Sequence, residues 1–260
     1  MTLERRAARS LLAFWADAGV ESLYASAPVD RMHRIEPPSP RRRAGAFEET
    51  AQPQEGTESS LARELAWSAP DLAALGAAIA AFDGCPLKTQ GARQAVFSRG
   101  SADAPVMIIG EAPGMEEDAQ GAPFVGRAGR LLDKMVAAAG LDGRVFITNT
   151  VFWRPPGNRT PTRAEQAACS AFLERSIDLV RPRFLLLVGA AATGSVLAAK
   201  EGILSLRGRW FEWRAHHFDL EVPALPTLHP AFLLRQPAAK KMAWRDLMLL
   251  VERLDRSDRP

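Results

Sequence analysis

The stretch PVMIIGEAPGMEEDAQGAPFVGRAGRLLDKMVAAAG, residues 105–140, decides the fold of this chain. It begins with a short apolar run, 105–110, that is typical of a buried strand. It ends with an amphipathic pattern over 128–140 that predicts a helix stopped by Gly140. A loop rich in glycine, proline and acidic residues joins the two. A strand that leads through a loop into a helix is the repeating unit of an α/β protein.

The same order of strand, loop and helix recurs towards the C-terminus. Apolar runs predict further strands at 144–153, 183–189 and 222–230, and helical patterns are found at 162–180, 190–200 and near 240–254. Because the apolar runs are continuous rather than alternating, helices are expected to cover both faces of the sheet. The sequence therefore predicts an α/β fold with a mostly parallel sheet.

Composition divides the chain into four parts. Residues 1–26 carry the pattern of an N-terminal helix, and residues 27–60, rich in Pro, Arg, Glu, Gln and Ser, predict a flexible linker. The main domain is expected at 61–255, and residues 256–260 form a tail.

The overall composition excludes several classes of protein. With 47% hydrophobic and 24% charged residues the chain has the make-up of a globular protein, and no run approaches the roughly 20 apolar residues of a membrane helix. Two cysteines far apart exclude a disulfide framework and favour a cytoplasmic location. A net charge of +3 is too small to indicate a nucleic-acid partner by itself.

Three polar side chains stand at or near the ends of predicted strands. They are Glu111, Asn149 and His229. Ligands of parallel sheets bind at the carboxyl ends of the strands, so these residues are candidates for a site. Each also has a structural alternative, since a loop carboxylate is usually solvated, a strand asparagine can make a structural hydrogen bond, and a lone histidine often packs. The residues alone leave both interpretations open.

The loops beside these strand ends carry further candidates. Phe124 in APFVG is either a core anchor or a stacking face for a flat ligand. Arg154 and Arg159 lie on the proline-stiffened loop RPPGNR. Leu233 and Arg235, in HPAFLLR, combine an apolar wedge type with a phosphate-contact type. The candidates that suit an interface with DNA are Arg154, Arg159, Leu233 and Arg235.

Taken in order, the motifs resemble the uracil-DNA glycosylase superfamily, most closely its family 4. The resemblance covers roughly residues 82–250 and rests on GEAPG (110–114), GAPFVGRAG (121–129), TN (148–149), RPPGNR (154–159) and HPAFLLR (229–235). It implies a central four-stranded, mostly parallel sheet with helices on both faces. It also implies hydrolysis of the N-glycosidic bond of deoxyuridine in DNA, which leaves an abasic site after the base has been flipped out of the helix.

The resemblance also implies the roles of individual residues. Glu111 is expected to activate the attacking water and His229 to stabilise the departing base, and these two form the catalytic set. The uracil-binding set is expected to contain the backbone at Ala112 and the side chains of Glu117, Phe124 and Asn149. Phe124 would stack on the base and Asn149 would hydrogen-bond its edge.

The chain departs from the family at the iron–sulfur site. Family 4 members usually hold a 4Fe–4S cluster on four cysteines, but here only Cys85 and Cys169 match ligand positions. Phe82 and Trp153 stand at the other two. We expect no cluster and no other cofactor, with the two aromatic side chains packing in the place of the cluster.

The expected partners are uracil-containing DNA and the abasic DNA product, with no membrane, and the protein is expected to be a monomer. Two alternatives stay open at this point. One is a non-catalytic protein that binds uracil or abasic sites, and the other is a glycosylase for another deaminated base.

Overall fold

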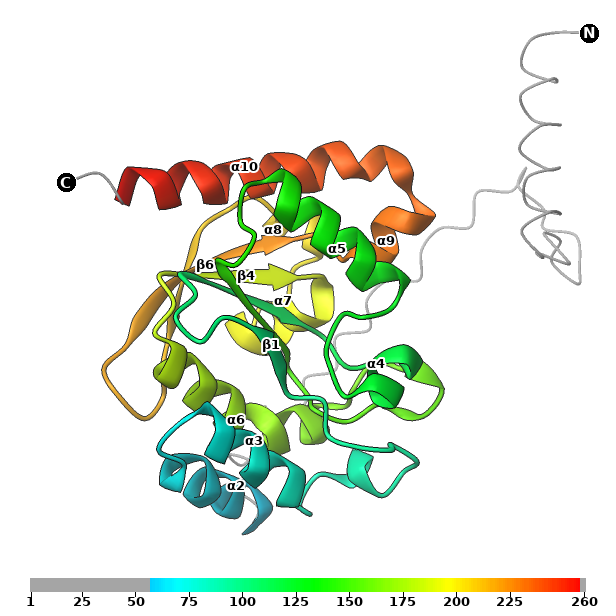
Figure 1. The fold of residues 1–260 in the computed structure, drawn as a ribbon, viewed down its shortest axis with the longest axis vertical. Coiled ribbons are helices and arrows are strands. Elements are labelled where there is room, and N and C mark those ends of the chain that lie inside the picture. Colours follow the sequence, from blue (N-terminus) through cyan, green and yellow to red (C-terminus); the bar gives the residue numbers. More distant parts are fainter. Residues whose placement is uncertain (1–56, 258–260) are drawn as a thin grey trace, which may run out of the picture. The chain divides into compact units, whose positions relative to one another are not determined.

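The computed structural model describes residues 57–257, and their fold is built around one six-stranded sheet (Figure 1). The strand order is β1-β3-β2-β4-β6-β5. The strands are β1 (Ser98–Gly100), β2 (Val106–Gly110), β3 (Val145–Asn149), β4 (Phe184–Val188), β5 (Phe211–Arg214) and β6 (Glu221–Thr227). The four inner strands run parallel to one another, whereas β1 and β5 pair antiparallel at the two edges.

The α/β class is therefore correct, and the expected strand number is corrected from four to six. The inner strands β2, β3 and β4 are buried along their whole length, as their continuous apolar runs predict. The edge strands are short and partly exposed, with the sequences SRG and FEWR. Such segments lack the apolar run of a strand covered on both faces, so the pattern that predicts the inner strands does not extend to them.

The helices form the outer layers. They are α2 (Thr57–Ser68), α3 (Leu72–Ala81), α4 (Met115–Gln120), α5 (Arg127–Ala138), α6 (Arg163–Val180), α7 (Ala190–Leu197), α8 (Ile203–Leu206), α9 (Pro230–Arg235) and α10 (Lys240–Ser257), with 3-10 turns η1 (Pro86–Lys88), η2 (Pro156–Asn158) and η3 (Pro237–Ala239). Figure 1 shows α5 and α10 over one face of the sheet and α6, α3 and α2 beyond the other.

Alternation along the strands separates two apolar layers. In β2, Met107 and Ile109 join the cluster that contains α2, α3 and α6, while Val106 and Ile108 join the cluster that contains α5 and α10. Successive side chains of a strand point to opposite faces, so a sheet with helices on both sides needs an apolar residue at every position. This requirement explains the run VMIIG.

The expected boundaries hold in part. The helix α6 begins at the predicted capping box, where the Thr162 hydroxyl accepts from the Glu165 amide and the Glu165 carboxylate accepts from the Thr162 amide. Helix α2 starts at Thr57, inside the segment 27–60 that was expected to be linker, and α10 extends through Ser257 into the expected tail. The expected N-terminal helix at 1–26 lies outside the described residues. None of the helices within 57–257 combines the length and hydropathy that a bilayer-spanning segment requires.

Candidate active site

A cavity of about 540 Å³ lies where the carboxyl ends of the inner strands meet. Register brings these ends together, since Gly110 of β2 pairs with Asn149 of β3 and Val188 of β4 pairs with Thr227 of β6. Eight of the residues singled out from sequence line the cavity, namely Glu111, Ala112, Glu117, Phe124, Asn149, Arg159, His229 and Arg235. The structure therefore brings these predicted residues together at one cavity.

Asn149 presents an unpartnered amide oxygen to this cavity. The residue is 1% exposed, and its Oδ1 atom has no hydrogen-bond partner among residues 57–257. A buried polar atom without a partner costs free energy, so it indicates a group that a ligand satisfies. Space for the amide and for the Phe124 ring exists because residue 110 is glycine. A Cβ there would lie 2.5 Å from Asn149 Oδ1 and 2.4 Å from Phe124 Cζ.

Phe124 is held in an uncommon backbone conformation. Its φ angle is 56°, in the left-handed region that non-glycine residues rarely adopt. The Arg99 guanidinium donates to the carbonyl oxygens of Pro123 at 2.7 Å and Phe124 at 3.2 Å, and it also pairs with Asp133. Gly129 allows the approach of helix α5, because a Cβ there would meet the Phe124 carbonyl oxygen at 1.6 Å.

The Phe124 ring lies beside the His229 ring across the cavity. Their centroids are 5.8 Å apart and the planes are inclined by 32°. Both rings line the cavity, so together they offer a flat ligand one aromatic face and one polar edge. Arg99 therefore fixes the position of one of these walls.

His229 caps helix α9 and is a neutral hydrogen-bond donor. Its Nδ1 atom accepts from the Ala231 amide at 3.1 Å, so the proton of the neutral ring is on Nε2. Burial, together with the charge of Arg235, lowers the pKa of His229 to about 4, against a smaller opposing effect of Glu117. At neutral pH the histidine thus donates one hydrogen bond from Nε2 without carrying charge.

The two acidic candidates differ in their surroundings. The backbone carbonyl of Glu111 accepts from the Thr150 hydroxyl at 2.7 Å, which fixes the turn while the carboxylate lines the cavity. The Glu117 carboxylate accepts from the backbone amides of Gly114 at 3.1 Å and Gly126 at 2.9 Å. Glu117 therefore ties the two ends of the loop together, and its expected contact with uracil stays a prediction.

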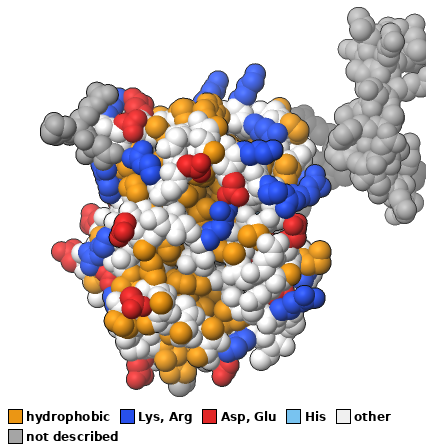
Figure 2. All heavy atoms as spheres, in the orientation of Figure 1, with side chains coloured by type: hydrophobic (Ala, Val, Ile, Leu, Met, Phe, Trp, Pro, Cys, Tyr) orange, Lys and Arg blue, Asp and Glu red, His pale blue; other side chains and the backbone are white. Residues whose placement is uncertain are grey.

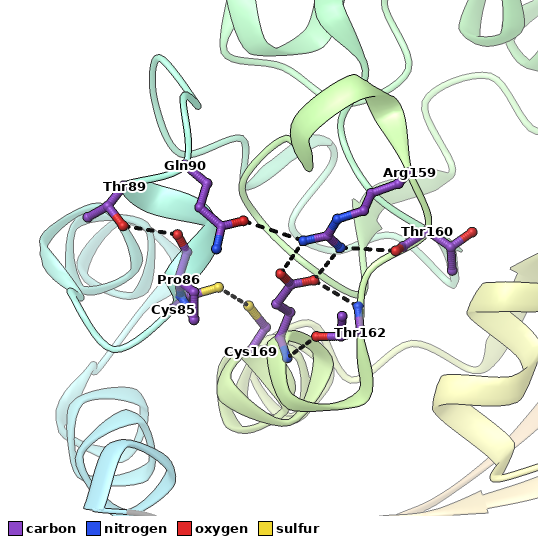
Figure 3. Close-up of polar contacts among 9 residues, drawn as sticks. Cys85, Pro86, Thr89, Gln90, Arg159, Thr160, Thr162 and Cys169 are labelled. Carbon is purple, nitrogen blue, oxygen red and sulfur yellow. Dashed lines mark hydrogen bonds and ion pairs between the residues drawn. The ribbon is translucent and has the colours of Figure 1, made fainter.

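The expected DNA-contact residues have mixed placements. The guanidinium of Arg159 pairs with the buried carboxylate of Glu165 and donates to Thr160 and Gln90 (Figure 3). The same pairing holds the pKa of Glu165 down to about 2. Arg154 donates to Asn158 at 2.7 Å within the loop. Both arginines therefore support the loop between β3 and α6.

The expectation that Leu233 contacts DNA is corrected. Leu233 is fully buried and packs with Leu228, Ala239 and Ala243. The neighbouring Leu234 is 37% exposed and is the leucine of this segment that an outside partner can reach. The helix α9 causes the difference, because adjacent residues of a helix point in different directions and a linear motif does not tell which one faces the core.

The expected iron–sulfur position contains two thiols and two aromatic rings. Cys85 and Cys169 lie with their Sγ atoms 3.9 Å apart, as Figure 3 shows. Phe82 and Trp153 are each 1% exposed, with ring centroids 6.5 Å apart. A 4Fe–4S cluster needs four thiolate ligands, and the whole chain has two cysteines. The residues present therefore do not fit the cluster.

Arg99 is the residue that sequence reasoning missed. It lies on the edge strand β1, which no apolar pattern reveals, and it acts on Phe124 from 25 residues away in the chain. An arginine in a short polar segment gives no sequence signal for such a contact.

The α/β fold thus carries, at the ends of its parallel strands, a cavity whose aromatic and polar walls suit a flat ligand. A family model of the uracil DNA glycosylase superfamily matches residues 97–248, more than half of the chain, and the chain belongs to this superfamily. Similar proteins include the type-4 uracil-DNA glycosylase of Sulfurisphaera tokodaii, 38% identical over 164 residues that cover 61% of this chain and 74% of that protein. The type-4 enzyme of Pyrobaculum aerophilum is 37% identical over 172 residues, which cover 64% and 86% of the two chains. The resemblance inferred from the motifs is confirmed.

Proposed function

We propose that this chain is a uracil-DNA glycosylase, which hydrolyses the N-glycosidic bond of deoxyuridine in DNA and releases uracil. The observation that carries the proposal is that one cavity brings together Glu111, Phe124, Asn149 and His229. The family membership and the type-4 relatives support the same activity.

The site holds the base by complementary contacts. A uracil in a duplex is out of reach, so it is flipped out, at a cost of a few kcal/mol that contacts in the cavity offset. Phe124 stacks on its face, and the amide of Asn149 hydrogen-bonds its edge. The unpartnered Oδ1 of Asn149 accepts from the uracil N3–H. Cytosine has no proton at N3, so the amide oxygen would stay unsatisfied, which disfavours that base.

Bond cleavage places negative charge on the base and positive charge on the sugar. Nε2–H of His229 donates to the uracil O2 and stabilises the departing anion without transferring its proton, since the ring is neutral. The carboxylate of Glu111 favours the oxocarbenium-like sugar and accepts a proton from water as the water oxygen bonds to C1′. The products are uracil and an abasic site.

We further propose that the chain works without an iron–sulfur cluster. Packing of Phe82 against Trp153 and Phe172 supports this proposal, because these rings belong to the same buried apolar cluster as Cys85 and Cys169. Iron and acid-labile sulfide analysis of anaerobically purified protein tests it. We expect far less than one iron atom per chain. Four irons per chain would overturn it. The sequence further predicts that the protein is a monomer, that it is located in the cytoplasm and that it releases abasic DNA as its product.

Uracil release from labelled oligonucleotides tests the activity. The wild type should release free uracil, whereas Glu111→Gln should be at least about 100-fold slower. Glu201→Gln, at an exposed position outside the cavity, is the matched control and should keep full activity. Tight binding of uracil-containing or abasic DNA without release of base would show a binding protein and contradict the proposal. Release of another deaminated base in preference to uracil would contradict the substrate assignment.

A further inference from the structure

A second, apolar groove lies beside the active site, between helices α5 and α10. Its cavity volume is about 290 Å³, and its lining consists of Leu131, Met135, Lys240, Lys241 and Trp244. Trp244 is 39% exposed, which is uncommon for so large an apolar ring. An exposed aromatic side chain in a groove with a charged rim is typical of a binding surface. We call these five residues the α5–α10 groove.

The rim of the α5–α10 groove is basic. Lys240 and Lys241 are exposed, and neither has an ion pair within residues 57–257. Further exposed cations on the same helices and on α9 are Arg127, Arg130, Lys134, Arg235 and Arg245, of which Arg130 pairs with Glu116. Asp133 is the exposed acid of α5, and it pairs with Arg99. Figure 2 shows lysine and arginine side chains over the upper part of this face, where α5, α9 and α10 lie.

The groove lies a short step from the cavity that takes the base. Along α5, Ala128 lines the active-site cavity, and Leu131 and Met135 line the groove. Because a helix rises about 1.5 Å per residue, Leu131 lies about 4.5 Å and Met135 about 10.5 Å from Ala128 along the helix axis. Phosphates of one DNA strand are spaced about 3.4 Å apart along the duplex axis, so the groove lies roughly one to three nucleotides from the flipped base.

We propose that the α5–α10 groove binds the DNA strand that flanks the uracil, with a base stacked on Trp244 and phosphates on Lys240 and Lys241. This inference rests on the proposed function. An apolar aromatic floor between lysines matches the two surfaces of a nucleotide, its base and its phosphate. A base can reach the floor only when it is unpaired, so the groove favours single-stranded DNA.

The first test compares Trp244→Ala with Leu249→Ala, a matched control at an equally exposed apolar position of the same helix. On a single-stranded substrate with twelve nucleotides on each side of the uracil, Trp244→Ala should raise KM about tenfold and leave kcat unchanged. On a trinucleotide with uracil in the middle, which reaches only the near end of the groove, the substitution should raise KM less than on the long substrate. Equal KM values for the wild type and Trp244→Ala on the long substrate would overturn the proposal. A fall in kcat on both substrates would do so too, because it would show a structural role.

The second test measures binding and does not depend on catalysis. The affinity for an oligothymidine without uracil is measured as salt is raised, for wild type, Lys240→Ala/Lys241→Ala and the control Lys200→Ala. Loss of two phosphate contacts should reduce the slope of log affinity against log salt by about 1.4, whereas the control should keep it. An unchanged slope would overturn the proposal. So would a dimer, seen by sedimentation and lost in Trp244→Ala, because a second copy of the chain would then fill the groove. If the wild type binds oligothymidine with the expected slope but releases no uracil, the proposed function fails and the groove stands.

Discussion

Substitution of Arg99 by alanine tests whether the stacking wall of the active site is held from a distance. Arg99 donates to the carbonyl oxygens of Pro123 and Phe124 and pairs with Asp133. Hydrogen bonds to a charged group contribute about 1.5–3 kcal/mol each, and the half-exposed ion pair with Asp133 adds at most about 1 kcal/mol. The Arg99 side chain is 30% exposed, so in the variant water replaces part of the lost hydrogen bonding. The free energy of unfolding should therefore fall by about 2–4 kcal/mol.

The effect on activity follows from the backbone of Phe124. A left-handed conformation costs a non-glycine residue about 1–2 kcal/mol, and Arg99→Ala removes the hydrogen bonds to Pro123 and Phe124 that offset this cost. The loop should relax, and the fraction of molecules with the Phe124 ring beside His229 should fall by about tenfold. We expect kcat/KM to fall, and the inhibition constant of free uracil to rise, by about that factor.

The assays are steady-state uracil release, inhibition by free uracil, and urea unfolding. Arg256→Ala is the control, because Arg256 is exposed on α10 and pairs with Glu252 far from the cavity. If Arg99→Ala loses stability as expected but keeps both kinetic constants within about twofold of the wild type, Arg99 is a structural residue only and the reasoning is refuted.

Three further predictions concern the cavity and its rim. The pKa of His229 is lowered to about 4 in the folded chain, so between about pH 6.5 and 4 the unfolded chain binds a proton that the folded chain does not. The free energy of unfolding, measured with urea, should therefore fall by about 2 kcal/mol between pH 7 and pH 5, and it should fall less in His229→Gln. Asn149→Ala should lower kcat/KM about 100-fold but leave the melting temperature in calorimetry no lower, since Oδ1 has no protein partner to lose. Leu233→Ala should cost about 2–5 kcal/mol of stability by leaving a cavity, whereas Leu234→Ala should be neutral in unfolding and slower in uracil release from duplex DNA. The first argument would be contradicted if the stability of His229→Gln depended on pH as steeply as that of the wild type. The second would be contradicted by a lower melting temperature of Asn149→Ala, and the third by equal losses of stability in Leu233→Ala and Leu234→Ala.

The sequence predicted the parts of the site that depend on topology. A parallel sheet brings the carboxyl ends of its strands to one edge, so Glu111, Asn149 and His229 could be placed together from strand order alone. The structure adds what topology does not determine. The orphaned oxygen of Asn149 and the tautomer of His229 depend on contacts with neighbouring atoms, which no residue pattern encodes.

Two errors have a common physical origin. The edge strand β1 and the orientation of Leu233 were missed because each depends on which side of a short element meets the core. A three-residue strand or a six-residue helix is too short for its apolar period to be resolved. Arg99 was missed with β1, so the error about an edge strand also hid the residue that positions Phe124.

The aromatic packing at the expected cluster position is connected to the active site by the chain itself. Trp153 directly precedes the loop from Arg154 to Arg159 that lines the cavity, and Cys169 belongs to α6, which also carries Glu165. Glu165 in turn holds Arg159. Any contact that holds α6 against the segment at Trp153, whether through a metal cluster or through apolar packing, therefore also fixes the loop from Arg154 to Arg159.

Phe82 at the end of α3 contacts Phe172 of α6 and Trp153 after β3, so the rings join the three segments that four cysteines would join. Each such ring buries about 150–250 Å², which at about 25 cal/mol per Å² stabilises the folded state by roughly 4–6 kcal/mol. Two rings thus contribute about 8–12 kcal/mol, which overlaps the lower end of the roughly 10–16 kcal/mol that a structural zinc ion contributes to a small domain. Large aromatic residues at two of the expected ligand positions are consequently compatible with an intact cavity, whereas alanine at both positions would remove the aromatic part of this loop's support and leave the contacts of Arg154 and Arg159.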